Sequence, residues 1–450
     1  MDWTRKPSVA DKDAMKKVTV LQMLVVNAYW VGISFMWNSL HPIVLPAVLL
    51  NLVPENQKNT WLGLLTFAGL IIAMLIQPLS GALSDRWASR WGRRRPLIVA
   101  GTLFDLLFLA FLGWSGGLLW MAVGYIGLQF TSNIAHGPMQ GLLPDRVPPR
   151  QIGTASGFKN LIDMGGLIIS SLLAGRLLDG QTRHPVLIIT IIAAVLVGSM
   201  LITVLGVREE PSHHNQNISR RPADLFAGFK GISLKSHSSF WRLMGSRLAF
   251  LIGVYGIQTF LQYYLRDVFL APNPARLTGD LMVVIAISLV ALSVTGGWLC
   301  DRFGAKRVLY TAGGLGILGS LLLLTAHTTA ALTAYGSILG AGIGLFVTAN
   351  WALATRLAPI AEAGKFLGLT NLATAGAGAF SKLEGPLIDL VNNAKPGAYL
   401  GYYGLFVLGA LGAAVSLLLL RKVHEPQVEL FVLDETAEVP LDAPMPDEVD

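Results

Sequence analysis

Residues 81–96 read Gly-Ala-Leu-Ser-Asp-Arg-Trp-Ala-Ser-Arg-Trp-Gly-Arg-Arg-Arg-Pro, and residues 297–307 repeat the pattern as Gly-Trp-Leu-Cys-Asp-Arg-Phe-Gly-Ala-Lys-Arg. Asp85 and Asp301 are 216 residues apart, as are the glycines that open the two copies. Each copy lies between two long apolar stretches, so the motif recurs at the same point of both halves of the chain. The repeat predicts a protein built from two duplicated bundles of membrane helices.

The composition indicates a polytopic membrane protein rather than a soluble domain. Only 14% of the 450 residues are charged and 53% are hydrophobic. Apolar runs recur at about 20 residues each, the length that spans a bilayer. We therefore expect an all-α membrane protein of two pseudo-symmetric six-helix bundles. Its twelve transmembrane helices are expected at 19–41, 60–83, 97–114, 117–137, 153–175, 185–206, 241–265, 279–299, 308–325, 330–351, 366–388 and 399–420.

The placement of the basic residues predicts the topology. Lys and Arg gather in the N-terminal segment and in every second loop, while the loops between are nearly bare apart from exceptions such as Lys58, Arg266 and Lys395. By the positive-inside rule both termini are expected in the cytoplasm, with the chain in the plasma (inner) membrane. The net charge of +7 then reflects this bias, and nucleic acid is excluded as a partner. The single Cys300 excludes an intrachain disulfide.

The same pattern divides the chain into five segments. We expect a cytoplasmic N-terminus at 1–18, an N-terminal bundle at 19–206, a cytoplasmic linker at 207–240, a C-terminal bundle at 241–420 and an acidic, disordered tail at 421–450. Within the linker, residues 223–232 carry an apolar side that predicts a short interfacial helix.

The repeated loop resembles the signature of the major facilitator superfamily. Its longer first copy, with Gln77-Pro78 before it, looks like the sucrose-transporter and glycoside-pentoside-hexuronide cation symporter branch. The resemblance implies that a charge cluster closes the cytoplasmic side, with Asp85 at the start of the eleventh helix and Asp301 at the start of the fifth. In the alternative interpretation the arginines only fix topology and bind anionic lipid headgroups. The gating candidates are Gly81, Asp85, Arg86, Gly92, Arg93, Arg94, Arg95, Gly297, Asp301, Arg302, Gly304, Lys306 and Arg307.

Polar side chains at helical spacing in apolar spans predict the substrate site. The resemblance implies that the first, fourth, seventh and tenth helices line the cavity. Amides, indoles and phenols suit a neutral, hydroxyl-rich ligand. Alternatively, such amides only bond neighbouring helices. The binding candidates are Asn27, Trp30, Asn38, Gln129, Asn133, Tyr255, Gln258, Gln262 and Asn350.

Carboxylates inside the spans are candidates for coupling to protons. Asp163, beside two glycines in the fifth helix, is the leading carrier, because close packing there would keep it from bulk water, and Asp105 is the next. In the alternative each is a structural residue bonded to a neighbouring helix. Gln129 and Gln140 stand where the sugar symporters carry an Asp and an Arg. Coupling through those familiar groups is therefore not expected, which leaves uniport or export open.

The expected function is secondary active transport of a small organic solute, with a sugar or glycoside as the first choice, by alternating access and with protons as a candidate coupling ion. Two alternatives are an exporter of amphipathic compounds on the same fold and a non-transporting membrane sensor or scaffold. No nucleophile–base set, phosphate loop or metal motif is found in the sequence, so we expect neither an enzyme nor a cofactor. The expected partners are a small-molecule substrate and the lipid bilayer, and the expected state is a monomer.

Overall fold

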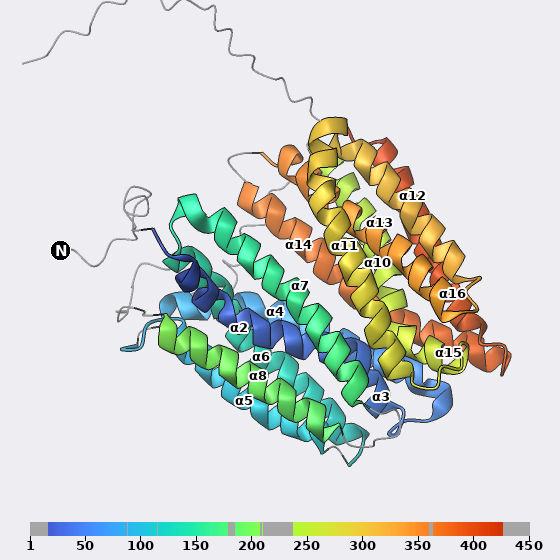
Figure 1. Ribbon diagram of the computed structural model, residues 1–450, viewed down its shortest axis with the longest axis horizontal. Helices are drawn as coiled ribbons and strands as arrows, with labels where there is room; N and C mark the ends of the chain where they lie inside the picture. Colours follow the sequence, from blue (N-terminus) through green and yellow to red (C-terminus); the bar gives the residue numbers. More distant parts are fainter. Residues whose placement is uncertain are drawn as a thin grey trace, which may run out of the picture.

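The computed structural model describes residues 17–425 apart from 88, 115, 179–184, 208, 210–236 and 360–362, and gives only the backbone of 363–365. The described chain is helical, and its helices form two bundles side by side (Figure 1). The expected interfacial helix at 223–232 and the acidic tail beyond residue 425 lie outside the described residues.

The first bundle contains α2 (Val20–Ser39), α3 (Leu45–Leu49), α4 (Lys58–Arg86), α5 (Arg95–Gly113), α6 (Leu118–Arg146), α7 (Ile152–Leu177) and α8 (Val186–Gly206). The second contains α10 (Ser238–Asp267), α11 (Pro274–Phe303), α12 (Ala305–Leu323), α13 (Thr329–Leu357), α14 (Ala363–Phe380), α15 (Glu384–Ala394) and α16 (Leu400–Arg421). With α2 and α3 counted as one span, and α14 and α15 as another, the twelve expected helices and the expected fold class are confirmed.

Side-chain caps fix where several helices begin. Thr19 accepts a hydrogen bond from the backbone N–H of Gln22, and the Gln22 side chain accepts one from the backbone N–H of Thr19, which is a capping box at the start of α2. Asn273 and Thr328 cap α11 and α13 in the simpler way, each with its side-chain oxygen. These bonds satisfy N–H groups that the first turn of a helix leaves without partners.

The first span is longer than the expected 19–41. After α2 the chain forms a π-helical turn at Leu40–Val44 and continues as α3 to Leu49. Pro42 and Pro46 lack the backbone N–H that a regular helix would donate here, so the backbone leaves the α-helical pattern. The turn places His41 against α6, with its Nε2 atom 3.0 Å from the hydroxyl of Tyr125.

The expected eleventh span, 366–388, is broken in the structure. α14 and α15 are joined by a 3-10 turn at Ser381–Leu383. The turn lies against α4 of the other bundle, where a Cβ atom added to Gly63 would lie 2.2 Å from the carbonyl oxygen of Lys382. The absence of a side chain at position 63 therefore allows the broken helix and the first bundle to touch.

Nine helical segments of the described chain are long and apolar enough to cross a membrane by length and composition. The other three expected spans are α6, which carries the polar stripe of the fourth helix, α12, and the broken pair α14 and α15.

The two bundles meet at one end and separate toward the other. α7 and α11 converge toward the end that holds α3 and α15 (Figure 1). There, a Cβ atom added to Gly279 of α11 would lie 2.4 Å from the Ser171 carbonyl oxygen of α7. At the opposite end, Cβ atoms added to Gly157 of α7 or Gly297 of α11 would meet no described atom within 4 Å. The repeated loop motifs thus lie at the end where the bundles are apart.

Candidate functional site between the two bundles

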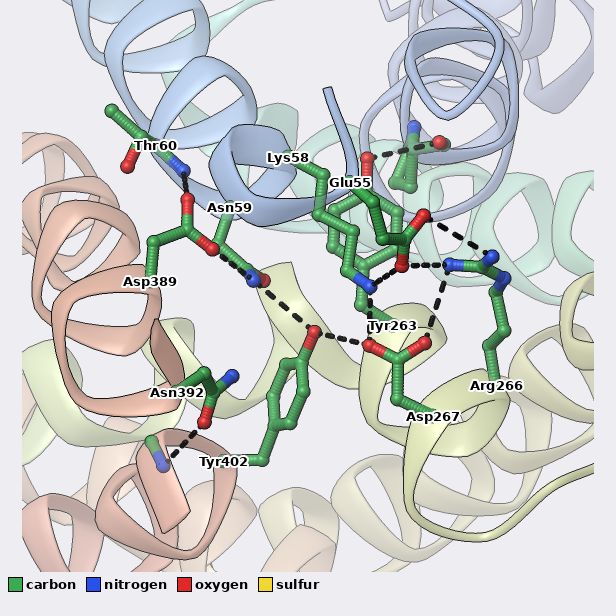
Figure 2. A network of polar contacts seen from close by, with 12 residues as sticks. Glu55, Lys58, Asn59, Thr60, Tyr263, Arg266, Asp267, Asp389, Asn392 and Tyr402 are labelled. Carbon is green, nitrogen blue, oxygen red and sulfur yellow. Dashed lines mark hydrogen bonds and ion pairs between the residues drawn. The ribbon is translucent and has the colours of Figure 1, made fainter. Parts of the chain in front are cut away.

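Charged side chains join the bundles at the end where α4 begins and α10 ends (Figure 2). Lys58 Nζ lies 2.5 Å from Asp267 Oδ2, and Lys58 also pairs with Glu55. Arg266 pairs with Glu55 at 2.7 Å and with Asp267 at 3.2 Å. Because the side chains of Lys58 and Asp267 are only 4% and 5% exposed, these two charges neutralise each other away from water.

The same contacts extend into α15 and α16. Asp389 accepts a hydrogen bond from the Thr60 backbone N–H at 2.6 Å and another from Asn59 Nδ2 at 2.8 Å. Thr60 lies in the first turn of α4, so the carboxylate also faces the positive end of that helix. The Tyr402 hydroxyl accepts from Asn59 at 3.1 Å and donates to Asp267 at 2.7 Å. We call the set Glu55, Lys58, Asn59, Thr60, Arg266, Asp267, Asp389 and Tyr402 the inter-bundle network.

Sequence reasoning missed this network and treated Lys58 and Arg266 only as exceptions in otherwise bare loops. A usable signal was present, because each of these cations has an acidic residue close by in the sequence. Glu55 precedes Lys58 by three residues, and Asp267 follows Arg266 directly. Charged residues are rare in these loops. When the loop leading into α4 and the end of α10 both carry charges of opposite sign, a contact between the two segments is indicated.

In the first loop motif the ion pairs stay within the first bundle. Asp85 Oδ1 lies 2.6 Å from Arg94 Nη2, and Arg94 Nε also bonds Asp145 of α6 at 3.0 Å. Arg93 pairs with the same Asp145 at 2.6 Å. Gly92 has a φ of 93°, a conformation that favours glycine, and so provides the sharp turn into α5.

The second motif is arranged in a similar way within the second bundle. Asp301 Oδ1 lies 3.8 Å from Arg356 Nη2 at the end of α13. Arg302 lies over the Trp298 ring, and Lys306 donates to the Val423 carbonyl at 2.6 Å. The expected contacts of Asp85 with the eleventh helix and of Asp301 with the fifth are not made by the described residues in this conformation. They stay predictions for a conformation in which the motif end is closed.

Two glutamates outside the motifs accept hydrogen bonds from the helices that follow the two loop motifs. Glu209 accepts hydrogen bonds from the backbone N–H groups of Arg94 and Arg95 at the start of α5, both at 3.0 Å. Glu425 accepts in the same way from the first two residues of α12, at 2.9 and 3.1 Å. The two glutamates are 216 residues apart (425 − 209). This is the offset of the loop motifs, and it could have identified the pair from the sequence.

Several amides of the predicted substrate site bond their own bundle. Asn27 has no exposed surface and donates to the carbonyls of Met23 and Ala155 at 2.9 and 3.1 Å. Gln129 donates to the Tyr125 hydroxyl at 2.8 Å, and Asn133 donates to the Gln129 carbonyl at 2.7 Å. The half-buried Asn38 donates to the Ser34 carbonyl at 2.9 Å.

Trp30 stands in a cluster of ionisable side chains. The ammonium of Lys159 lies 4.0 Å from the centre of a Trp30 ring, and His136 meets the indole edge-on. The same ammonium pairs with Asp163 at 2.9 Å, one turn along α7. The side chain of Asp163 is 25% exposed, so the expected exclusion of this carboxylate from water is not what the structure shows. The other candidate, Asp105, is fully buried and accepts a 2.5 Å bond from Thr131 of α6.

The face of α10 predicted to line the cavity points toward the other bundle. With its amide oriented to satisfy both groups, Gln262 donates to the carbonyls of Pro42 and Ile43, at 2.9 and 3.0 Å. Tyr255 and Gln258, earlier in α10, are half-buried. Gln262 therefore holds the bundles together, while Tyr255 and Gln258 lie further toward the open end.

Asn350 of α13 contacts the guanidinium of Arg247. Arg247 of α10 is only 4% exposed. Its Nη1 donates to Asn350 Oδ1 and its Nε donates to Thr374 Oγ1, both at 2.8 Å. Arg247 thus ties α10 to α13 and α14.

A further pair of charges lies at the break in the eleventh helix. Lys382 bonds the hydroxyl of Thr259 in α10. The side chain of Glu384 is directed at α10, where a Cβ atom added to Gly256 would fall within 3 Å of both carboxylate oxygens. Glu384 is 6% exposed, and neither oxygen accepts a hydrogen bond from the described residues.

Comparison with known proteins agrees with this architecture. The family model "Major Facilitator Superfamily" matches residues 18–381. A "Multidrug resistance protein MdtG" of Enterobacter lignolyticus (strain SCF1) is 25% identical over 390 residues, 85% of this chain and 88% of that protein. A bacterial homologue of the human lysosomal transporter Spinster superposes with a TM-score of 0.68 at 15% identity, over 90% of this chain and 98% of that chain. A D-xylose–proton symporter superposes with a TM-score of 0.65 at 16% identity, over 90% of this chain and 99% of that chain. The chain belongs to the major facilitator superfamily and is a polytopic membrane transporter, not an enzyme.

Proposed function

We propose that this protein is a secondary active transporter that moves a small organic solute by alternating access. The observation that carries the proposal is the contrast between the two ends of the molecule. The inter-bundle network joins the bundles at one end, while the loop motifs lie apart at the other. With both termini in the cytoplasm, as the basic loops predict, the open end faces inward and the network closes the outer side.

For the solute, we favour export of an amphipathic compound. The sugar interpretation relied in part on amides as donors and acceptors for the ligand, but Asn27, Gln129 and Asn133 already donate to neighbours in their own bundle. Aromatic and charged groups such as Trp30 and Arg247 remain as recognition elements. MdtG relatives at low identity are named as multidrug resistance proteins, which supports this choice.

Sugar or glycoside transport is the second candidate. It is favoured by Asn38 and Gln258, whose side chains are half-buried and so are not fully enclosed by their own bundles. In either case the protein works as a monomer, and protons are the proposed coupling ion. Asp163 and Asp105 stay the proposed carriers.

Transport by purified protein in proteoliposomes tests the proposal. An amphipathic fluorescent dye and a radiolabelled disaccharide are offered in parallel, with and without a proton gradient. Gradient-dependent movement of the dye supports export, and movement of the disaccharide alone favours the second candidate. Binding of either compound without movement would instead favour the sensor. A cysteine introduced at Lys395 should react with an impermeant reagent added outside intact cells, and protection there would contradict the topology.

A further inference from the structure

Arg247 is a cation inside the second bundle that has no counter-ion among the described residues. Its two hydrogen bonds go to neutral oxygens, those of Asn350 and Thr374. Its Nη2 atom makes no hydrogen bond to a described residue, and no carboxylate of the described chain lies within 4 Å of the guanidinium. A charge within a membrane span is costly and is a candidate functional group by default.

Two other cations lie within the described spans. Lys159 pairs with Asp163 at 2.9 Å. Lys382 donates to the Thr259 hydroxyl, and the acidic residue Glu384 follows it two positions along the chain. Arg247 has neither a described carboxylate within 4 Å nor an acidic residue within four positions of it in the sequence.

Arg247 also lies on the side of α10 that a solute would meet. Residues 247, 255, 258 and 262 fall on one face at helical spacing, and Gln262 on that face contacts the other bundle. Arg247 is fifteen residues before Gln262, or roughly 22 Å along the helix at 1.5 Å per residue. It is therefore displaced from the closed end toward the end where the bundles are apart.

We propose that Arg247 recognises an anionic group of the transported solute, so that the solute is an organic acid, such as a carboxylate or phosphonate with an apolar body. The planar guanidinium presents paired N–H donors that match two oxygens of one acid group. Asn350 and Thr374 hold the side chain in place and leave Nη2 for the ligand. This inference rests on the proposed transport function and specifies its substrate class.

The structure also provides an internal substitute for the ligand. Asn350 Oδ1 accepts from Arg247 at 2.8 Å, while Asn350 Nδ2 is buried and has no partner among the described residues. Asn350→Asp keeps the shape, removes the unpaired donor and places a carboxylate against the guanidinium. The introduced carboxylate is expected to pair with the guanidinium that an acidic solute would bind, in a protein that still folds.

Binding of matched acids and amides tests the proposal without any need for transport. Thermal shifts and equilibrium binding are measured for full-length protein with naphthalene-2-carboxylate, benzylphosphonate and the uncharged naphthalene-2-carboxamide. The wild type should bind at least one acid about tenfold more tightly than the amide, a difference of about 1.4 kcal/mol. Arg247→Gln and Asn350→Asp should both remove this preference, and Arg247→Lys should keep part of it. Arg242→Gln removes an arginine from the same helix that donates to the Lys422 carbonyl, and it should change nothing.

Several results would overturn the inference. One is that the acids bind to the wild type no more tightly than the amide. Another is that folded Asn350→Asp protein keeps the preference for acids. An acid preference lost equally in Arg242→Gln would show a general surface effect. Anionic lipid is the other source of the same chemistry, so binding is repeated in nanodiscs of neutral lipid and of neutral lipid with phosphatidylglycerol. If the acid is displaced by the anionic lipid at Arg247, a lipid headgroup is the ligand and the solute assignment is wrong. If the acids bind but are not moved in proteoliposomes, the transport proposal fails while the anion site stands.

Discussion

Asp267→Asn should move the protein toward the conformation in which the network end is open. Asp267 contacts Lys58 of the other bundle at 2.5 Å, while its contact with Arg266 lies within α10. Of the contacts that Asp267 makes, only the one with Lys58 crosses between the bundles and is lost when they part, so only that contact contributes to the effect of this substitution. Hydrogen bonds to charged groups contribute about 1.5–3 kcal/mol. Because Glu55 remains as a partner for Lys58, we take about 2 kcal/mol, which corresponds to a shift of roughly 30-fold.

Distances between spin labels measure this shift directly. One pair, at Asn51 and Lys395, reports across the bundles at the network end, and a second pair, at Thr154 and Trp298, reports at the motif end. These positions are exposed in the structure. The labels are placed in a background from which the native cysteine has been removed. In Asp267→Asn protein the distance at the network end should lengthen and the distance at the motif end should shorten. A ligand is not needed, because a mutation that favours one state changes the populations by itself.

A matched control is available in the Asp280→Asn substitution. Asp280 of α11 pairs with Arg176 of α7 across the bundles at 3.6 Å, but their side chains are 42% and 50% exposed. Exposed pairs contribute about 0–1 kcal/mol, so this variant should move the distances little. Equal shifts in both variants, or no shift in Asp267→Asn, would refute the argument that the buried pair holds this end closed.

Three further predictions concern the motif end and coupling. Asp85→Asn should slow transport more than it weakens ligand binding, and normal flux in both Asp85→Asn and Asp301→Asn would rule out a gating role. Glu425→Gln should lower the free energy of unfolding by about 1 kcal/mol, the range seen for lost helix caps, and thermal unfolding measured in the same detergent checks it against wild type. Asp163→Asn should abolish accumulation driven by a proton gradient yet keep exchange of internal for external solute. Unchanged accumulation would make Asp163 a structural partner of Lys159.

The sequence was sufficient for the fold because the evidence for it is local and repeated. The loop motif recurs with one offset, and apolar runs have the length of a membrane span. The network could not be derived in the same way, since Lys58 and Asp267 are more than 200 residues apart and meet only after both bundles are packed. The break at Ser381–Leu383 was also missed, because an apolar run does not show where a helix changes direction.

The candidate site was predicted less well, and the reason is geometric. Helical spacing placed Asn27 and Gln129 on one face of their helices, but spacing cannot tell a cavity from a neighbouring helix. The structure turns both amides toward neighbours in the same bundle. For Asp163 the useful signal was Lys159, four residues earlier, since opposite charges at this spacing meet on a helix.

Two ion pairs, Lys58 with Asp267 at the closed end and Asp301 with Arg356 at the motif end, differ in burial and should respond differently to ionic strength. Mobile ions screen charges that water reaches, over a Debye length of about 10 Å at 0.1 M salt, and screen buried pairs much less. The carboxylate of Asp301 is 83% exposed, whereas Lys58 and Asp267 are nearly inaccessible. Added salt should therefore weaken the contact of Asp301 with Arg356 and leave that of Lys58 with Asp267 intact. Concentrated buffers used in purification should then leave the buried contact that joins the bundles in place.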